Sequence, residues 1–361
     1  MNYATKLLLV SLIITILGLF TIYSLGSRSP KVGALLFFYR QLFWIVIGLF
    51  FLFLTYKINY QRFWEISYLL YGIVILLLIL VLILGNVRLG AQRWLKFLWF
   101  NFQPSELAKL SIIIVLSRYF SQRWQIYLES EKNSFLKDVI FPSFIVGVVV
   151  FLILQQPDLG SGILIFFIYL GLLYLSKTKR TYIGLLLLII LILSPLLWRL
   201  LKDYQRDRIL CFLNPNLDPL GVGYTMMQSK IAIGSGSLFG KGWLAGTQGQ
   251  LRFLPEAHTD FIFATFAEEW GFLGCSLLLF LYYLFISYSL KIAYKTEETF
   301  AKFLAYGISL MFAIQIFINI AMSTGLAPVV GLPLTFFSYG GSSILISFIS
   351  VGILLNINKR L

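Results

Sequence analysis

The chain has 361 residues, of which 59% are hydrophobic and 12% charged, and its formal net charge is +14. Soluble globular domains carry about 25% charged residues, so this composition excludes that class and indicates an integral membrane protein. In such a protein an excess of Lys and Arg is typical of loops that contact anionic membrane lipids, and nucleic acid is not expected as a partner.

Ten apolar stretches follow one another along the chain, each near the roughly 20 residues that a helix needs to cross a bilayer. We therefore predict an all-α membrane protein, a single domain over residues 1–361 with about ten transmembrane helices and no cleaved signal peptide. Once the longest loop is set aside, the Lys and Arg bias of the remaining loops places both termini in the cytoplasm. The predicted spans are 7–25, 36–56, 64–84, 107–120, 139–154, 159–175, 182–201, 261–290, 303–322 and 336–355.

The first polar segment on the outer side, residues 87–109, begins by alternating cations with aromatic side chains. Two interpretations stay open: an interfacial amphipathic stretch at headgroup depth, or a cationic platform for a lipid phosphate. On the second interpretation Arg93 and Lys96 are candidate substrate-binding residues. The alternating residues are Arg88, Arg93 and Lys96 with Trp94, Phe97, Trp99 and Phe100.

The same segment ends in the sequence QPSELAK, which is typical of a helix start. Pro104 suits the first helical position, and Glu106 falls in the first turn, where the helix dipole favours an anion. Lys109 lies three residues further on the same face and could pair with Glu106. The two residues form either an internal ion pair or part of a substrate-binding site.

A second helix start, QQPDLG, repeats this arrangement with Asp158 after a proline. The acid either stabilises its own helix or contributes to substrate binding. Further along, residues 202–259 form a long extracytoplasmic loop between the seventh and eighth spans, and its glycines argue against one long helix. Within it Lys241 follows a glycine-rich stretch but precedes neither Ser nor Thr, so no nucleotide is expected. A loop of this length is more often functional than idle.

The sequence LRFLPEAHTDFIFATFAEEWG, residues 251–271, places an acidic residue where this loop meets the eighth span. An acidic group at the lip of a span normally faces a water-filled cavity, a partner charge or a substrate headgroup, so Asp260 is the main catalytic candidate. His258 is the only histidine, and a lone loop histidine is more typical of a structural hydrogen-bonding group than of a catalyst. It is kept as a substrate-binding candidate.

A stripe of small residues is predicted beneath this carboxylate. If the span is one regular helix from Asp260 onward, Glu268 points about 80° away from the carboxylate, because each residue turns the helix by about 100°. The stripe would let a helix or a lipid chain approach closely. It consists of Asp260, Ala264, Ala267, Gly271 and Gly274.

The last polar segment, GLAPVVGLPLTFFSYGGSS over residues 325–343, is punctuated by glycine and proline between apolar spans. Irregular backbone at membrane depth must be buried in protein or line a cavity, so a structured loop is predicted, with Ser338 and Ser342 as substrate-binding candidates. Cys211 and Cys275 form no zinc pattern and receive no role. Any metal would be held by oxygen atoms, partly from a substrate phosphate.

The ten-span pattern and a set of motifs together resemble the SEDS family of bacterial cell-wall polymerases, nearly end to end. Within that family the sequences GKGW, GTQ and FLPEAHTDFIF look more like the elongation members than the division members. Two departures are visible: Leu334, Thr335 and Phe336 stand where the family has LPF after its proline, and Ser237 stands in place of a second glycine. The motifs are QRWLKF, QPSELAKL, QPDLGSG, IAIGSG, FGKG, LPEAHTDFIF and GLPLTFFSYGGSS.

This resemblance implies a peptidoglycan glycosyltransferase that polymerises lipid II at the outer face of the bacterial cytoplasmic membrane during cell elongation. Asp260 occupies the family's essential acidic position, and a carboxylate there can take the proton of an attacking sugar hydroxyl. The leaving pyrophosphate would be neutralised by cations such as Arg93, Lys96 and Lys109, or by a divalent cation, Mg²⁺ or Mn²⁺. The implied partners are membrane lipids, a class B penicillin-binding protein and the elongation machinery.

Two other classes compete with this hypothesis. A lipid II flippase would also show ten helices with intramembrane charges and broken loops, although the charged motifs collect on one side and no inverted halves are visible. A scaffold that only recruits a cell-wall synthase would leave the acidity of Asp260 without a purpose. The most informative observation is whether the purified protein makes glycan polymer from lipid II, with and without Asp260.

Overall fold

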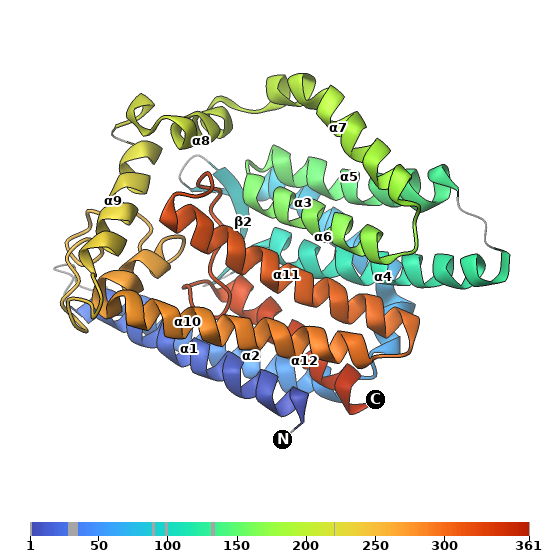
Figure 1. Cartoon of the computed structure of the whole chain (residues 1–361), viewed down its shortest axis with the longest axis horizontal. Coiled ribbons are helices and arrows are strands. Elements are labelled where there is room, and N and C mark those ends of the chain that lie inside the picture. Colours follow the sequence, from blue (N-terminus) through green and yellow to red (C-terminus); the bar gives the residue numbers. More distant parts are fainter. Residues whose placement is uncertain are drawn as a thin grey trace. The chain divides into compact units, whose positions relative to one another are not determined.

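The computed structural model describes residues 2–27, 35–88, 91–97, 100–130, 134–219 and 221–360. Helices dominate it, as Figure 1 shows. In chain order the helices are α1 (Tyr3–Ser27), α2 (Leu36–Lys57), α3 (Gln61–Leu84), α4 (Pro104–Ser130), the π-helical turn η1 (Leu136–Ile140), α5 (Phe141–Gln155), α6 (Leu159–Leu175), α7 (Arg180–Leu200), α8 (Asp203–Leu213), the 3₁₀ turn η2 (Pro215–Leu217), α9 (Val222–Ser235), α10 (Ile262–Lys295), α11 (Thr299–Thr324) and α12 (Gly341–Lys359).

Each of the ten predicted spans corresponds to one of these helices. Among the described residues, seven helical stretches are long and apolar enough to cross a membrane: α1, α2, α3, η1 with α5, α10, α11 and α12. The apolar helix α6 is shorter, with 17 residues. The prediction of an all-α, multi-pass membrane protein is confirmed, and the exact number of crossings stays a prediction.

The segment after α3 forms a small antiparallel sheet of three strands in the order β1 (Asn86–Arg88), β2 (Ala91–Phe97) and β3 (Phe100–Phe102). Leu95 lies opposite Phe102 and Lys96 opposite Asn101. Successive side chains of a strand point to opposite faces, so Arg93 and Lys96, three positions apart on β2, lie on opposite faces of the sheet. Of the predicted platform, Trp99 lies outside the described residues.

The long loop contains short helical segments, and no single helix spans it. It contains α8, η2 and α9, followed by turns up to Phe261. The prediction that its glycines prevent one long helix is confirmed, since α9 is only 14 residues long.

The helix α10 is interrupted, and this makes the predicted small-residue stripe wrong. Gly271 has φ 63° and ψ −162°, which is not helical, and Asp260 precedes the first helical residue, Ile262. The interruption arises because the backbone of residues 238–240 approaches Gly271 so closely that a Cβ there would collide with it. The stripe residues therefore do not share one face of a regular helix.

The last span begins later than predicted. Hydropathy predicts a start at residue 336, whereas α12 begins at Gly341, and residues 325–340 form turns and irregular backbone. Hydropathy cannot locate this start, because the irregular segment is itself apolar and largely buried. The prediction of a structured loop here is confirmed.

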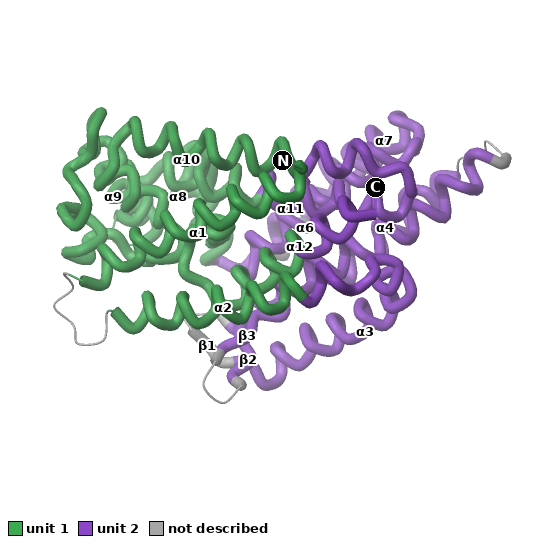
Figure 2. Tube along the Cα trace, turned by 90° about the horizontal axis from the view of Figure 1, so that it is seen from below, with its two compact units in different colours: residues 1–53, 204–288, 315–351 green, residues 54–203, 289–314, 352–361 purple. Residues whose placement is uncertain are grey.

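The chain divides into two compact units, coloured separately in Figure 2. Unit 1 comprises residues 1–53, 204–288 and 315–351, and unit 2 comprises residues 54–203, 289–314 and 352–361. Unit 1 contains Asp260 with the loops around it. Unit 2 contains the sheet and the starts of α4 and α6.

Candidate active site

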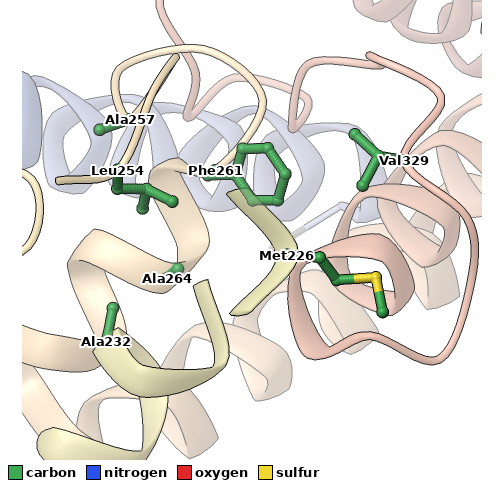
Figure 3. Packing of buried hydrophobic residues seen from close by; sticks show 7 residues of the cluster. All are labelled: Met226, Ala232, Leu254, Ala257, Phe261, Ala264 and Val329. Carbon is green, nitrogen blue, oxygen red and sulfur yellow. The ribbon is translucent and has the colours of Figure 1, made fainter. Parts of the chain in front are cut away.

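Asp260 lies in unit 1, half-buried at the end of the long loop and two residues before α10. The chain on its C-terminal side is fixed by Phe261, which is buried in an apolar cluster (Figure 3). This cluster joins α9, the long loop, the start of α10 and the segment before α12. Its members are Met226, Ala232, Leu254, Ala257, Phe261, Ala264 and Val329.

Three successive carbonyl oxygens hold the backbone around Asp260. The carbonyl of His258 accepts a hydrogen bond from the amide of Tyr339 at 2.9 Å. That of Thr259 accepts from the Ser338 hydroxyl at 2.6 Å, and that of Asp260 accepts from the Asn319 side-chain amide at 2.9 Å. The donors come from the end of α11 and the segment before α12, so the predicted loop forms a wall against which Asp260 is fixed.

Arg208 of α8 approaches the same wall and was not singled out by the sequence analysis. A Cβ built on Gly331 would lie 3.2 Å from Oδ2 of Asp260 and 3.6 Å from Nη1 of Arg208. The carboxylate and the guanidinium therefore face the same point. Gly331 has φ +75°, a conformation that favours glycine, and a larger residue would intrude between the two groups.

Nothing in the spacing of the sequence connects Arg208 with Asp260. The two residues are separated by most of the long loop. Arg208 lies two residues after Arg206 in a hydrophilic helix, which is typical of an ordinary solvated face. Its Nη1 donates to the carbonyl of Val329 at 3.1 Å, which holds the guanidinium against the wall. The proximity of Arg208 to Asp260 is therefore visible only in the folded structure.

His258 is placed by ring packing. Its imidazole centroid lies 4.4 Å from the ring of Phe37 and 5.7 Å from the ring of Tyr339. Burial lowers the pKa of the His258 imidazole from its usual 6.5, against the opposing effect of the Glu256 carboxylate. The ring is therefore neutral at pH 7, and acid destabilises the fold because the unfolded chain binds this proton more readily.

We expect His258→Phe to keep polymerase activity close to that of the wild type, because it preserves a ring packed against Phe37 and Tyr339 and replaces only the polar imidazole. It should also reduce the loss of thermal stability between pH 7.5 and pH 5.5, since the buried group that acid must charge is gone. Melting temperatures at both pH values and a polymerisation assay check this. A loss of activity as large as that of an Asp260 variant would give His258 a chemical role.

A cavity of about 380 Å³ in unit 1 is lined in part by the same loop, including His258. Its volume falls within the range of ligand pockets, and its walls are mostly apolar with a few ionisable side chains. It is lined by Ile22, Leu25, Gly26, Phe37, Gly249, Gln250, Arg252, Leu254, Pro255, Glu256, Ala257 and His258.

In unit 2, Glu106 and Lys109 form an ion pair with 2.7 Å between Oε2 and Nζ. The predicted pairing is confirmed. Both residues are almost fully buried, with exposed fractions of 3% and 1%. A buried charge is tolerated when it is paired, so the pair itself accounts for the position of both groups.

Asp158 caps α6 and joins it to the start of α4. Its carboxylate accepts hydrogen bonds from the amide of Ser161 at 3.2 Å and from the hydroxyls of Ser161 and Ser105 at 2.8 and 3.0 Å. The Gln103 side chain adds a fourth bond at 3.1 Å. The structure thus favours the helix-stabilising interpretation of Asp158 and brings the two predicted helix starts together.

The two cations of the predicted platform, Arg93 and Lys96, differ in their exposure and hydrogen bonding. The Arg93 guanidinium donates to the carbonyl of Pro157, beside Asp158, whereas Lys96 is exposed on β2. Of the two serine candidates in unit 1, the hydroxyl of Ser338 is used within the wall, where it also accepts from the amide of Leu334 at 2.7 Å. Ser342 is buried in the first turn of α12.

The expected divalent cation has no complete set of protein ligands. Across the described ranges, no three His, Cys, Asp or Glu side chains gather closely enough to hold a metal ion. A cation at Asp260 would therefore need most of its oxygen ligands from elsewhere, such as a substrate phosphate. The residues present do not fit a protein-held metal centre.

The fold and the sequence define the family to which the chain belongs. The model of the cell cycle protein family of FtsW, RodA and SpoVE matches residues 4–361, so the chain is a member of this SEDS family.

Individual relatives cover most of the chain. It is 43% identical over 294 residues to the peptidoglycan glycosyltransferase MrdB of Escherichia coli K12, which covers 81% of this chain and 77% of the relative. It is 36% identical to a probable peptidoglycan glycosyltransferase FtsW of Trichlorobacter lovleyi, over 100% of this chain and 94% of the relative.

Solved structures of related proteins have a fold similar to that of this chain. A chain of a peptidoglycan synthase complex has a TM-score of 0.80 and 30% identity, covering 98% of this chain and 97% of its own. The crystal structure of the rod shape determining protein RodA of Thermus thermophilus has a TM-score of 0.71 and 26% identity, covering 98% and 96%.

Proposed function

We propose that this protein is a peptidoglycan glycosyltransferase of cell elongation, which polymerises lipid II in the bacterial cytoplasmic membrane, with Asp260 as the general base. The observation that carries the assignment is that a half-buried carboxylate and a guanidinium approach the same glycine, Gly331, on a fixed wall. A base and a cation that face one point suit a reaction that removes a proton from one substrate and releases an anion from the other.

The chemistry needs one proton acceptor and one stabilised leaving group. A hydroxyl oxygen of the acceptor sugar attacks the anomeric carbon of the donor and forms the new glycosidic bond. The bond from that carbon to the pyrophosphate oxygen breaks, and its electron pair leaves with the lipid pyrophosphate. Asp260 takes the proton of the attacking hydroxyl. No second carboxylic acid is required, because the pyrophosphate departs as an anion.

Arg208 is the residue we assign to that anion in unit 1. A guanidinium stays charged and presents its donors in a fork that matches phosphate oxygens. A Mg²⁺ or Mn²⁺ ion shared between Asp260 and the substrate's phosphates remains an expectation, and no step above depends on it. In unit 2, Arg93 and Lys96 remain candidates for binding lipid phosphate, Lys96 because it is exposed.

We place both termini in the cytoplasm and Asp260 on the extracytoplasmic side, on the strength of the Lys and Arg bias of the loops. The proposed partner is a class B penicillin-binding protein within the elongation machinery. The similar solved chain comes from a complex that coordinates polymerization and crosslinking, which supports a transpeptidase as the kind of partner.

Reconstituted vesicles distinguish this function from lipid II transport. We expect the oriented wild-type protein, with its partner present, to form glycan chains only from lipid II in the leaflet that Asp260 faces. Asp260→Ala should form none, while transbilayer movement of labelled lipid II stays the same in both proteins. Addition of EDTA to the same assay tests for the divalent cation.

Movement of lipid II between leaflets that depends on Asp260, without any new glycosidic bond, would overturn the proposal in favour of a flippase. Polymer of normal length and yield from the Asp260→Ala protein would remove Asp260 from the reaction.

A further inference from the structure

The interruption of α10 is filled by another part of unit 1. The amide of Phe272 donates to the carbonyl of Ser237 at 2.9 Å, and that of Leu273 donates to Leu238 at 3.1 Å. In return the amides of Lys241 and Gly242 donate to the carbonyls of Glu268 and Glu269, each at 3.0 Å. In a membrane helix a break leaves polar backbone groups without partners, and this inserted segment, residues 236–242, supplies them.

Close backbone contact makes the insertion possible. A Cβ on Gly236, Gly240 or Gly271 would collide with the backbone of the opposing segment. Ser237, where the family has a second glycine, has φ +50° in the left-handed region. The insertion is therefore built into the backbone, and side chains must fix its position along the helix.

Glu268 is the side chain that does so. It is fully buried, and its Oε1 accepts from Lys241 Nζ at 2.6 Å, from the Thr247 amide at 2.8 Å and from the Thr247 hydroxyl at 2.7 Å. Its Oε2 accepts from the Gln248 amide at 3.0 Å. One carboxylate thus holds two stretches of the long loop, residue 241 and residues 247–248, against α10.

The neighbouring Glu269 provides a contrast. It is equally buried and accepts from the Ser24 hydroxyl of α1 and from the Gln250 side chain at 3.2 Å, but no described cation pairs with it. Its Oε2 has no hydrogen-bond partner within the described part of the chain. An amide could replace this carboxylate, because its oxygen would accept the same two hydrogen bonds.

We propose that Glu268, through its ion pair with Lys241, is a positioning residue for the proposed reaction. The pair holds the inserted segment in the break of α10. It thereby fixes the position of residues 262–270, the first turns of α10, along the helix axis and their rotation about it. These turns begin two residues after Asp260. Only the carboxylate of this pair is fully buried, since the Lys241 side chain is 30% exposed. A buried charge is strongly destabilised without its partner, so the pair favours the one position of the segment in which Lys241 reaches Glu268. This inference rests on the proposed function, since it assigns a role in that reaction.

The test compares Glu268→Gln with the matched control Glu269→Gln. For Glu268→Gln we expect kcat for lipid II polymerisation to fall by about a hundredfold with KM nearly unchanged, since a small displacement of a catalytic group has an effect of this size. Lys241→Met should behave in the same way, Lys241→Arg should restore most of the activity, and Glu269→Gln should remain close to wild type. A role limited to stability would lower the yield of folded protein and leave kcat per folded molecule intact.

Hydrogen exchange gives a readout that does not depend on activity. In Glu268→Gln the amides of residues 241–248 and 262–270 should exchange faster than in Glu269→Gln. Unchanged exchange, or faster exchange with a normal kcat, would overturn the positioning role. If the wild type forms no polymer but the exchange difference is present, the proposed function is wrong, while the role of Glu268 in positioning residues 262–270 is retained.

Discussion

Asp260→Asn is expected to fold and insert normally and to lose polymerisation of lipid II by a factor of about 10²–10⁴, the usual contribution of a general base. The amide keeps the size of the side chain but cannot take the proton of the acceptor hydroxyl. The backbone around it should be unaffected, because the bond from Asn319 reaches the carbonyl of residue 260 and not its side chain. The measurement is polymer length and yield per folded protein.

Glu256→Gln is the matched control, since it removes an exposed carboxylate from the same loop, four residues away. It should retain activity. The general-base role further requires that wild-type activity declines as acid protonates Asp260. Appreciable polymer from well-folded Asp260→Asn protein would exclude Asp260 as the base.

The second large effect is expected at the buried ion pair of unit 2. Lys109→Met should destabilise the protein by about 3–5 kcal/mol, because it leaves the carboxylate of Glu106 buried without its cation. In the double variant Glu106→Gln with Lys109→Met no uncompensated charge remains, so most of the stability should return. Thermal melting of the detergent-solubilised proteins compares the three.

Activity separates the two interpretations of this pair. If it is an internal ion pair, as its burial favours, the double variant should polymerise lipid II nearly as well as the wild type. A double variant that is stable yet inactive would instead give Lys109 a role in binding the substrate's phosphates.

The membrane helices were accessible from the sequence because each is a long apolar run, and hydropathy measures that property directly. Local pairings were accessible for a similar reason: Lys109 lies three residues after Glu106 in one helix, and Asp158 stands at a helix start. These contacts follow from helix geometry alone.

The stripe, which was predicted wrongly, and the contacts that the sequence did not predict all depend on the approach of distant segments. The stripe below Asp260 assumed a regular helix, and only the approach of residues 238–240 explains why Gly271 interrupts it. The meeting of Arg208 with Asp260 depends on how the long loop folds back, which no spacing reveals. The contacts of the Glu268 carboxylate could not be predicted for the same reason, since its hydrogen-bond partners lie 20 to 27 residues earlier in the chain.

The fixation of residues 258–260 through their carbonyl oxygens has an evolutionary consequence. Peptide carbonyls are present whatever the side chain, so mutations at His258 and Thr259 can change what the loop presents to a substrate without moving the carboxylate. The constraint falls instead on the donors, Ser338 and Asn319. Related enzymes could therefore change their preference for sugar or peptide variants while the backbone around the catalytic carboxylate stays the same. Positions 258 and 259 are accordingly starting points for engineering new acceptors.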